Sequence, residues 1–347
     1  MQNLLIRADA NSNIGTGHIM RCLAIAQAWR SVGGRVWFAA ASVPDAIYEQ
    51  LRIEGFETIN LNSNDDPQTV VGHAVYLQAS HIVLDGQRFD SDYQCEIKQA
   101  RLNLLVLDDY GEAGHYYADC VVNSDLVLES LYDKREPYTH LFLGPSYALL
   151  RSEFKRTNKT PESTARNVRV LITMGGSDLQ NMTLTALEAI ERIQAQNVEF
   201  RVIVGAANSR FEALQKFAKK ILFPIEVMKN VGDMPAQMQW ADVAIVAAGV
   251  SLWELLYMGV AVTCWPRYRQ DVQVLEELSK RGAVLPLNLD ADADAIAKAL
   301  TRLLTDLKLR HSLQLAGSNM VDGQGAKRVV EIFSQLAATS PEGIKAH

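Results

Sequence analysis

The most informative residues lie in a short turn near the N-terminus that contains two glycines and a histidine. The segment Asp9–Cys22 reads DANSNIGTGHIMRC; the apolar run Leu4–Ile6 before it predicts a β-strand, and the apolar-periodic run after it predicts a helix. A glycine-rich turn between strand and helix lets backbone N–H groups approach an anion, and the helix dipole adds positive potential there. His18 starts the helix, so a group that can carry a proton near neutral pH lies beside a candidate phosphate site.

Three residues of this region are candidate catalytic residues. His18 is a candidate general base that activates water or a sugar hydroxyl; the alternative is that it only hydrogen-bonds the loop. Arg21 follows one helical turn later, where it can contact a phosphate or a sugar, or pair with Asp9. Asp9 ends the first strand, from which a carboxylate can orient a base, bind a ligand or cap a turn. The candidate ligand-binding residues of the turn are Asn13, Gly15 and Gly17.

Neither a metal nor a cofactor is expected. The four cysteines show no C-x-x-C spacing, which predicts buried free thiols. Cys22 lies four residues after His18, but no further Cys or His stands nearby at ligand spacing.

Two turns in the second half repeat the strand–turn–helix pattern. Gly175, Gly176 and Ser177 follow the apolar strand 168–173. Tight turns need glycine for purely structural reasons, so this signal alone is weak. Ala248, Gly249, Ser251 and Glu254 follow another apolar strand; they predict a diphosphate on the backbone amides and a ribose on the carboxylate, or merely an S-x-x-E capping box.

Three further carboxylates end strands of the first half. Asp85 follows one apolar strand, and Asp108 and Asp109 follow the next. Acid–base work at a cleft is one interpretation; a strand end that caps its own turn is the other.

The periodicity predicts alternating strands and helices in two halves. Strands are predicted at 3–8, 35–40, 57–61, 81–85, 103–107, 119–122, 140–143, 168–173, 199–204, 224–228, 242–247, 260–264 and 283–285. Helices are predicted at 17–32, 43–54, 67–79, 91–101, 181–194, 209–219, 250–257, 270–281, 293–305 and 325–337. This α/β alternation indicates two doubly wound, Rossmann-like domains facing a cleft, at 1–150 and 165–325, joined by a polar connection around 144–167 and followed by a C-terminal helix and tail, 326–347.

Composition narrows the class of protein. The 347 residues are 48% hydrophobic and carry a formal net charge of −6, so the chain has no basic footprint for nucleic acid. It shows neither a signal-peptide pattern nor an apolar run that spans a bilayer, and we expect a cytoplasmic protein. The sequence leaves the oligomeric state open.

The turn around His18 resembles the opening of a known family. The run Arg7–Leu23 is similar to that of the UDP-2,4-diacetamido-2,4,6-trideoxy-β-L-altropyranose hydrolases of pseudaminic acid biosynthesis, relatives of the SpsG-type spore-coat proteins. Further stretches that resemble this family are LDDY at 107–110, LGPSYALLR at 143–151, MGGSD at 174–178 and AAGVSLWE at 247–254.

The resemblance implies a fold and a reaction. It implies a GT-B fold like that of the MurG glycosyltransferase, metal-independent removal of UDP from a UDP-sugar, His18 as the base and a second domain that grips the nucleotide. A glycosyltransferase acting on a UDP-sugar donor in surface-polysaccharide synthesis is the alternative; a non-catalytic binder or a 2-epimerase is a third possibility.

The chain departs from the family pattern at two places that would touch the sugar. Gln87 stands where the family typically has the tyrosine of Asp-x-Tyr. Arg269, before Gln270, stands where the family usually has an asparagine. Both Arg269 and Gln270 are therefore candidate substrate-binding residues.

Overall fold

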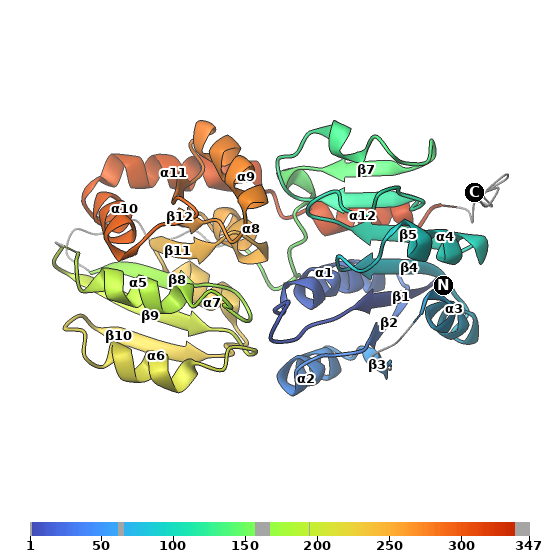
Figure 1. Ribbon diagram of the computed structural model, residues 1–347, viewed down its shortest axis with the longest axis horizontal. Coiled ribbons are helices and arrows are strands. Elements are labelled where there is room, and N and C mark those ends of the chain that lie inside the picture. The colour runs from blue at the N-terminus through green and yellow to red at the C-terminus, as the bar shows by residue number, and fades with distance from the viewer. Residues whose placement is uncertain (1, 62–65, 157–166, 194, 337–347) are drawn as a thin grey trace. The chain divides into compact units, whose positions relative to one another are not determined.

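A computed structural model describes residues 2–61, 66–156, 167–193 and 195–336 (Figure 1). Contacts within the chain divide it into two units: Met1–Ala10, His18–Ser152 and Gln324–His347 form the first, and Asn11–Gly17 with Glu153–Gly323 form the second. Much of the predicted connection, residues 157–166, lies outside the described residues.

The first unit is built on a seven-stranded parallel sheet of order β3-β2-β1-β4-β5-β6-β7. Its strands are β1 (Asn3–Ala8), β2 (Arg35–Ala40), β3 (Glu57–Asn60), β4 (Ala79–Asp85), β5 (Asn103–Leu107), β6 (Cys120–Asn123) and β7 (His140–Leu143). Its helices are α1 (Gly17–Ser31), α2 (Asp45–Ile53), α3 (Pro67–Tyr76), α4 (Ser91–Gln99) and α12 (Gly325–Phe333), with short 3-10 turns at Glu129–Tyr132 and Pro145–Tyr147.

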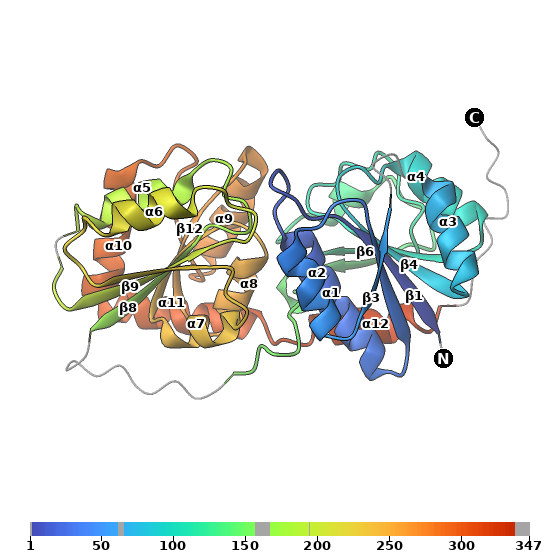
Figure 2. The ribbon, with the colours of Figure 1, turned by 90° about the horizontal axis from the view of Figure 1, so that it is seen from below.

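Helices cover both faces of this sheet, as the apolar strands predict. Successive strand residues alternate between two cores: Leu4 and Ile6 pack with α1, α2 and α12, whereas Leu5 packs with α3 and α4. Figure 2 shows these two helical layers on opposite sides of the sheet. The C-terminal helix, which the sequence suggested as a separate segment, thus completes the core of the first unit.

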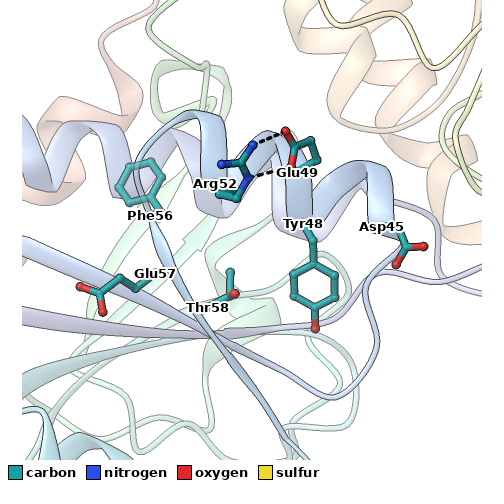
Figure 3. A pocket seen from close by; sticks show the side chains of 7 residues that line it. All are labelled: Asp45, Tyr48, Glu49, Arg52, Phe56, Glu57 and Thr58. Carbon is teal, nitrogen blue, oxygen red and sulfur yellow. Dashed lines mark hydrogen bonds and ion pairs between the residues drawn. The ribbon is translucent and has the colours of Figure 1, made fainter.

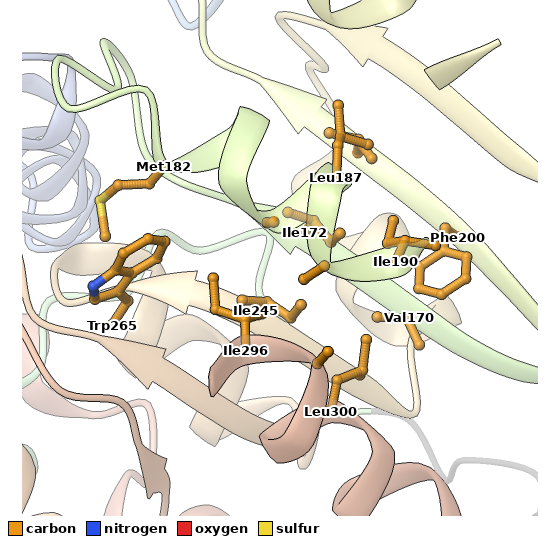
Figure 4. Close-up of a cluster of buried hydrophobic side chains, with 14 of the residues drawn as sticks. Val170, Ile172, Met182, Leu187, Ile190, Phe200, Ile245, Trp265, Ile296 and Leu300 are labelled. Atoms are coloured by element: carbon orange, nitrogen blue, oxygen red, sulfur yellow. The ribbon is translucent and has the colours of Figure 1, made fainter. Parts of the chain in front are cut away.

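The second unit repeats the plan with a six-stranded parallel sheet of order β10-β9-β8-β11-β12-β13. Its strands are β8 (Val168–Thr173), β9 (Val198–Val204), β10 (Ile225–Lys229), β11 (Val243–Ala247), β12 (Ala261–Trp265) and β13 (Leu285–Pro286). Its helices are α5 (Met182–Ile190), α6 (Phe211–Ala218), α7 (Met234–Trp240), α8 (Val250–Tyr257), α9 (Arg269–Lys280), α10 (Ala293–Thr305) and α11 (Leu307–Met320). Figure 4 shows its largest buried cluster, where Val170, Ile172 and Ile245 of the sheet meet Ile190 of α5 and Ile296 of α10.

Two helices of the second unit were not predicted. The seven residues of α7 are too few to show a clear apolar period, although Asp233 caps the helix through the N–H of Ala236 and Pro235 stands in its first turn. In α11 the weak helix formers Gly317, Ser318 and Asn319 obscure the pattern. A Cβ on Gly317 would lie 2.8 Å from Leu256 Cδ2, so a larger residue there would require this leucine side chain to shift.

In both sheets the direction of strand order reverses at one place, and the predicted residues gather there. The reversal falls between β1 and β4, where Ala8 pairs with Asp85, and between β8 and β11. Open α/β sheets bind ligands at the carboxyl ends of the strands beside such a reversal. The turns containing His18, Gly176 and Gly249 all leave these strand ends.

Within the described parts of the chain, no helix combines the length and apolar character needed to cross a membrane.

Candidate functional site

His18 is the second residue of α1, and its side chain reaches toward the end of β4. The side chain is 21% exposed, and its Nδ1 lies 3.9 Å from Oδ1 of Asp85. This nitrogen is buried and has no hydrogen-bond partner among the residues that the structure describes. Gly86, the residue after Asp85, adopts φ +147°, a conformation that favours glycine. The end of β4 therefore lies beside the Nδ1 edge of the imidazole.

Arg21 joins two of the three strand-end carboxylates. Its Nε and one terminal nitrogen donate to the two oxygens of Asp85 at 2.7 and 2.6 Å, and the other terminal nitrogen donates to Asp109 at 2.5 Å. Burial would lower the pKa of Arg21, but the charges of Asp109 and Asp85 outweigh it and raise that pKa well above its ordinary value. Arg21 is thus a permanent cation held by two anions, and it does not pair with Asp9.

Asp9 stabilises the turn that follows β2 by accepting hydrogen bonds from its backbone. Its carboxylate accepts hydrogen bonds from Arg7 at 2.8 Å and from the backbone N–H groups of Ala41 and Ser42 at 2.8 and 3.2 Å. Burial alone would raise the pKa of Asp9, but these donors lower it. The contacts are those of the turn-capping alternative, and a catalytic role for Asp9 stays a prediction.

The turn before His18 is organised by Asn11, which sequence reasoning missed. Its side-chain oxygen accepts from the N–H groups of Asn13 and Ile14 at 2.8 and 3.1 Å, and its carbonyl accepts from Gly15 at 2.8 Å. Gly15 has φ +78°, which favours glycine. These three N–H groups are therefore already bonded. An anion at this turn, which stays a prediction, would therefore bind the N–H groups at the start of α1, because the first N–H groups of a helix have no intrahelical partner.

Asp108 and Asp109 have different roles although they are neighbours. Asp108 accepts from the N–H of Gly111 at 2.6 Å and from the hydroxyls of Tyr116 and Tyr132 at 2.7 and 3.2 Å. Burial raises the pKa of Asp108 above its ordinary value, although these donors oppose it. The buried network holds the strand end in shape, and Asp109 is the one that reaches Arg21.

In the second unit, Gly175, Gly176 and Ser177 form a tight turn between β8 and α5. Gly175 has φ +80°, and the carbonyls of both glycines lie against Gly205, where a Cβ would clash at 2.5 and 2.3 Å. The Asp178 carboxylate caps α5 by accepting from the N–H groups of Met182 and Thr183 at 2.7 and 3.1 Å. The turn is therefore fixed on both sides.

The start of α8 differs from the capping box that was one interpretation of Ser251 and Glu254. The N-cap is Gly249, no side chain caps the helix, and Ser251 is its second residue. Glu254 is buried, with 4% of its surface exposed. The first N–H groups of α8 are therefore not occupied by an N-cap side chain, and this end of the helix can receive an anion.

Arg267 lies at this helix start and was missed by sequence reasoning, which selected Arg269. A Cβ on Gly249 would lie 3.4 Å from a terminal nitrogen of Arg267. Asp271 accepts from the N–H of Arg267 at 2.7 Å, and Gln180 donates to its carbonyl at 2.7 Å. Arg269 and Gln270 are exposed in the first turn of α9. Arg267 stands two residues after the end of β12 and two residues before α9, and only the start of that helix distinguishes it from Arg269.

A surface pocket elsewhere contains none of the predicted residues. It lies between α2 and β3 and is lined by Asp45, Tyr48, Glu49, Arg52, Phe56, Glu57 and Thr58 (Figure 3). Glu49 and Arg52 pair with each other there at 2.6 Å. Among the described residues, no group of three or more His, Cys, Asp or Glu side chains is arranged to hold a metal ion.

No family model matches the chain, but curated proteins are similar to it in sequence. It is 27% identical over 273 residues to the spore coat polysaccharide biosynthesis protein SpsG of Bacillus subtilis, covering 70% of this chain and 79% of that protein. It is 26% identical over 223 residues to the UDP-2,4-diacetamido-2,4,6-trideoxy-β-L-altropyranose hydrolase of Campylobacter jejuni, covering 62% and 74%. An uncharacterized protein of Methanocaldococcus jannaschii is 26% identical over 280 residues; the match covers 78% of this chain but only 56% of that protein.

Solved structures establish the fold. MurG of Acinetobacter baumannii matches with a TM-score of 0.64 and 13% identity, over 97% of this chain and all of that one. The lipopolysaccharide glycosyltransferase WaaG matches with a TM-score of 0.65 and 13% identity, over 96% of this chain and all of that one. The chain therefore has the GT-B fold of two Rossmann-like domains, as the sequence predicted.

Proposed function

We propose that this chain is a UDP-sugar hydrolase of the GT-B class, with a diacetamido-trideoxy sugar as its substrate. The observation that carries the proposal is His18 at the start of α1, its buried Nδ1 turned toward the Asp85–Arg21–Asp109 group. The similarity to the Campylobacter hydrolase supports the choice of substrate.

The reaction needs a base and a stabilised leaving group. His18 takes a proton from water as the oxygen attacks the anomeric carbon, and the bond from that carbon to the diphosphate oxygen breaks, releasing UDP. The N-terminus of α8 and the guanidinium of Arg267 are the groups proposed to stabilise the charge that develops on the diphosphate. The buried carboxylate of Glu254 is the proposed ribose ligand.

An assay without acceptor tests the reaction type. The protein is incubated with UDP-2,4-diacetamido-2,4,6-trideoxy-β-L-altropyranose and related UDP-sugars in ¹⁸O-labelled water, and UDP release and the position of the label are measured. We expect UDP release without acceptor, with ¹⁸O on the anomeric carbon of the freed sugar. UDP release only after adding an acceptor would instead indicate a glycosyltransferase, and an unlabelled isomer of the substrate would indicate an epimerase.

A further inference from the structure

His18 and Asp85 lie close together but do not form a hydrogen bond. The 3.9 Å from Nδ1 to Oδ1 exceeds the 2.7–3.2 Å of a normal hydrogen bond, yet Nδ1 is buried and, within the described parts of the chain, has no hydrogen-bond partner. A buried ring nitrogen without a partner is costly. A hydrogen bond to Asp85, the carboxylate 3.9 Å away, would satisfy it.

We propose that Asp85 is a positioning residue that selects the tautomer of His18. Its carboxylate places the proton on Nδ1, so that the lone pair of the neutral ring is on Nε2. Nε2 is then the atom that accepts the proton of water, and this second step rests on the proposed function. The tautomer itself does not depend on that function.

The surroundings of Asp85 make its carboxylate a fixed acceptor. Arg21 binds both of its oxygens, and the Cys22 thiol contacts Oδ2 at 3.5 Å. Burial raises the pKa of Cys22 well above its ordinary value, so that the thiol stays neutral. Oδ1 takes one bond from Arg21 and has capacity for a second, on the side that faces His18.

The local charge favours a donor on Nδ1 over a lone pair. The ion-pair network beside the imidazole contains Asp85 from β4, Arg21 from α1 and, beyond Arg21, Asp109 after β5. Two carboxylates and one guanidinium sum to a negative charge. A lone pair on Nδ1 would be repelled by Oδ1, whereas an N–H is attracted.

Nitrogen-15 NMR of the labelled full-length protein, at a pH where His18 is neutral, reads the tautomer directly. His18→Asn identifies the signals of this residue. We expect the Nδ1–H form in the wild type and in Asp109→Asn, which removes a partner of Arg21 without touching His18. Asp85→Asn should raise the share of the Nε2–H form, because a neutral amide attracts a donor on Nδ1 less strongly than the carboxylate does, whichever of its atoms faces the ring. An Nε2–H ring in the wild type overturns the proposal without any variant, and so does an unchanged share of the two tautomers in a folded Asp85→Asn protein.

Kinetics separate positioning from substrate binding. If the wild type hydrolyses the UDP-sugar, Asp85→Asn should lower kcat by about 10- to 100-fold with little change in KM, because a misoriented base affects the chemical step. An unchanged kcat in that variant contradicts the proposed role. A wild type without hydrolase activity refutes the proposed function, while the NMR result still decides the tautomer.

Discussion

Arg21 shows how one side chain determines the local arrangement around His18. Its guanidinium lies between Asp85, which is 1% exposed, and Asp109. The arginine is one helical turn after His18, and the helix that carries both begins at Gly17. The spacing of His18 and Arg21 was predictable from sequence. Asp85 was identified from sequence as a strand-end carboxylate, but its pairing with Arg21 was not, because it depends on the register of β1 and β4 and joins residues 64 positions apart.

Replacing Arg21 with methionine should strongly destabilise the protein. The change leaves the buried charge of Asp85 without its partner, and such losses cost about 3–5 kcal/mol. Urea denaturation measures the free energy of unfolding. Arg52→Met, which removes an exposed pair with Glu49, is the matched control and should cause no measurable change. Equal effects of the two variants would show that Arg21 is not the structural centre of this site.

At the scale of elements, α12 is tied to the first sheet by a buried histidine. Nε2 of His81, on β4, lies 3.1 Å from the carbonyl of Phe333 at the end of α12, and both rings pack against Trp29. Burial lowers the pKa of His81 from 6.5 to about 4. The folded state therefore holds this histidine neutral over a range in which the unfolded chain binds a proton.

This histidine should make stability fall as the pH is lowered from 6.5 to about 4. Above that range both states are neutral at His81, and within it only the unfolded state gains a proton, at a cost of up to about 3 kcal/mol. We expect the free energy of unfolding of the wild type to fall more between pH 7 and pH 4.5 than that of His81→Gln. Parallel pH profiles for the two proteins would argue against a neutral buried His81.

The elements themselves were largely predictable. Both sheets were predictable because strands that are buried on two faces appear in the sequence as short apolar runs, and several of these runs end in glycine turns. The choice between Arg267 and Arg269 was not predictable, because it depends on where α9 begins. Asp271 accepts from the N–H groups of Arg267 and Tyr268, which starts the helix at Arg269 and leaves Arg267 before it.

At the level of the whole molecule, we propose that the two Rossmann-like units have different functions in the reaction. In this proposal the first unit would supply the base and the second would hold the nucleotide. The predicted cleft between them stays a prediction. The division itself can be tested, because variants of the two units should affect different steps.

Arg267→Ala should weaken UDP binding by roughly 10- to 100-fold, the loss expected for a charge-assisted contact with phosphate. Isothermal titration with UDP measures it, and a thermal melt of each variant checks the fold. Arg269→Ala, which removes an exposed cation of the next turn, is the comparison and should have the smaller effect. A larger loss of UDP affinity in Arg269→Ala than in Arg267→Ala would instead favour Arg269, the residue selected from sequence, as the phosphate contact.

His18 as the general base is tested most directly by comparing His18→Asn with the wild type in acceptor-free UDP release, with UDP affinity measured on the same samples. We expect the variant to lose turnover by about 10²- to 10⁴-fold, the usual contribution of a general base, while its UDP affinity stays unchanged. A variant that releases UDP at the wild-type rate would show that another group activates the water.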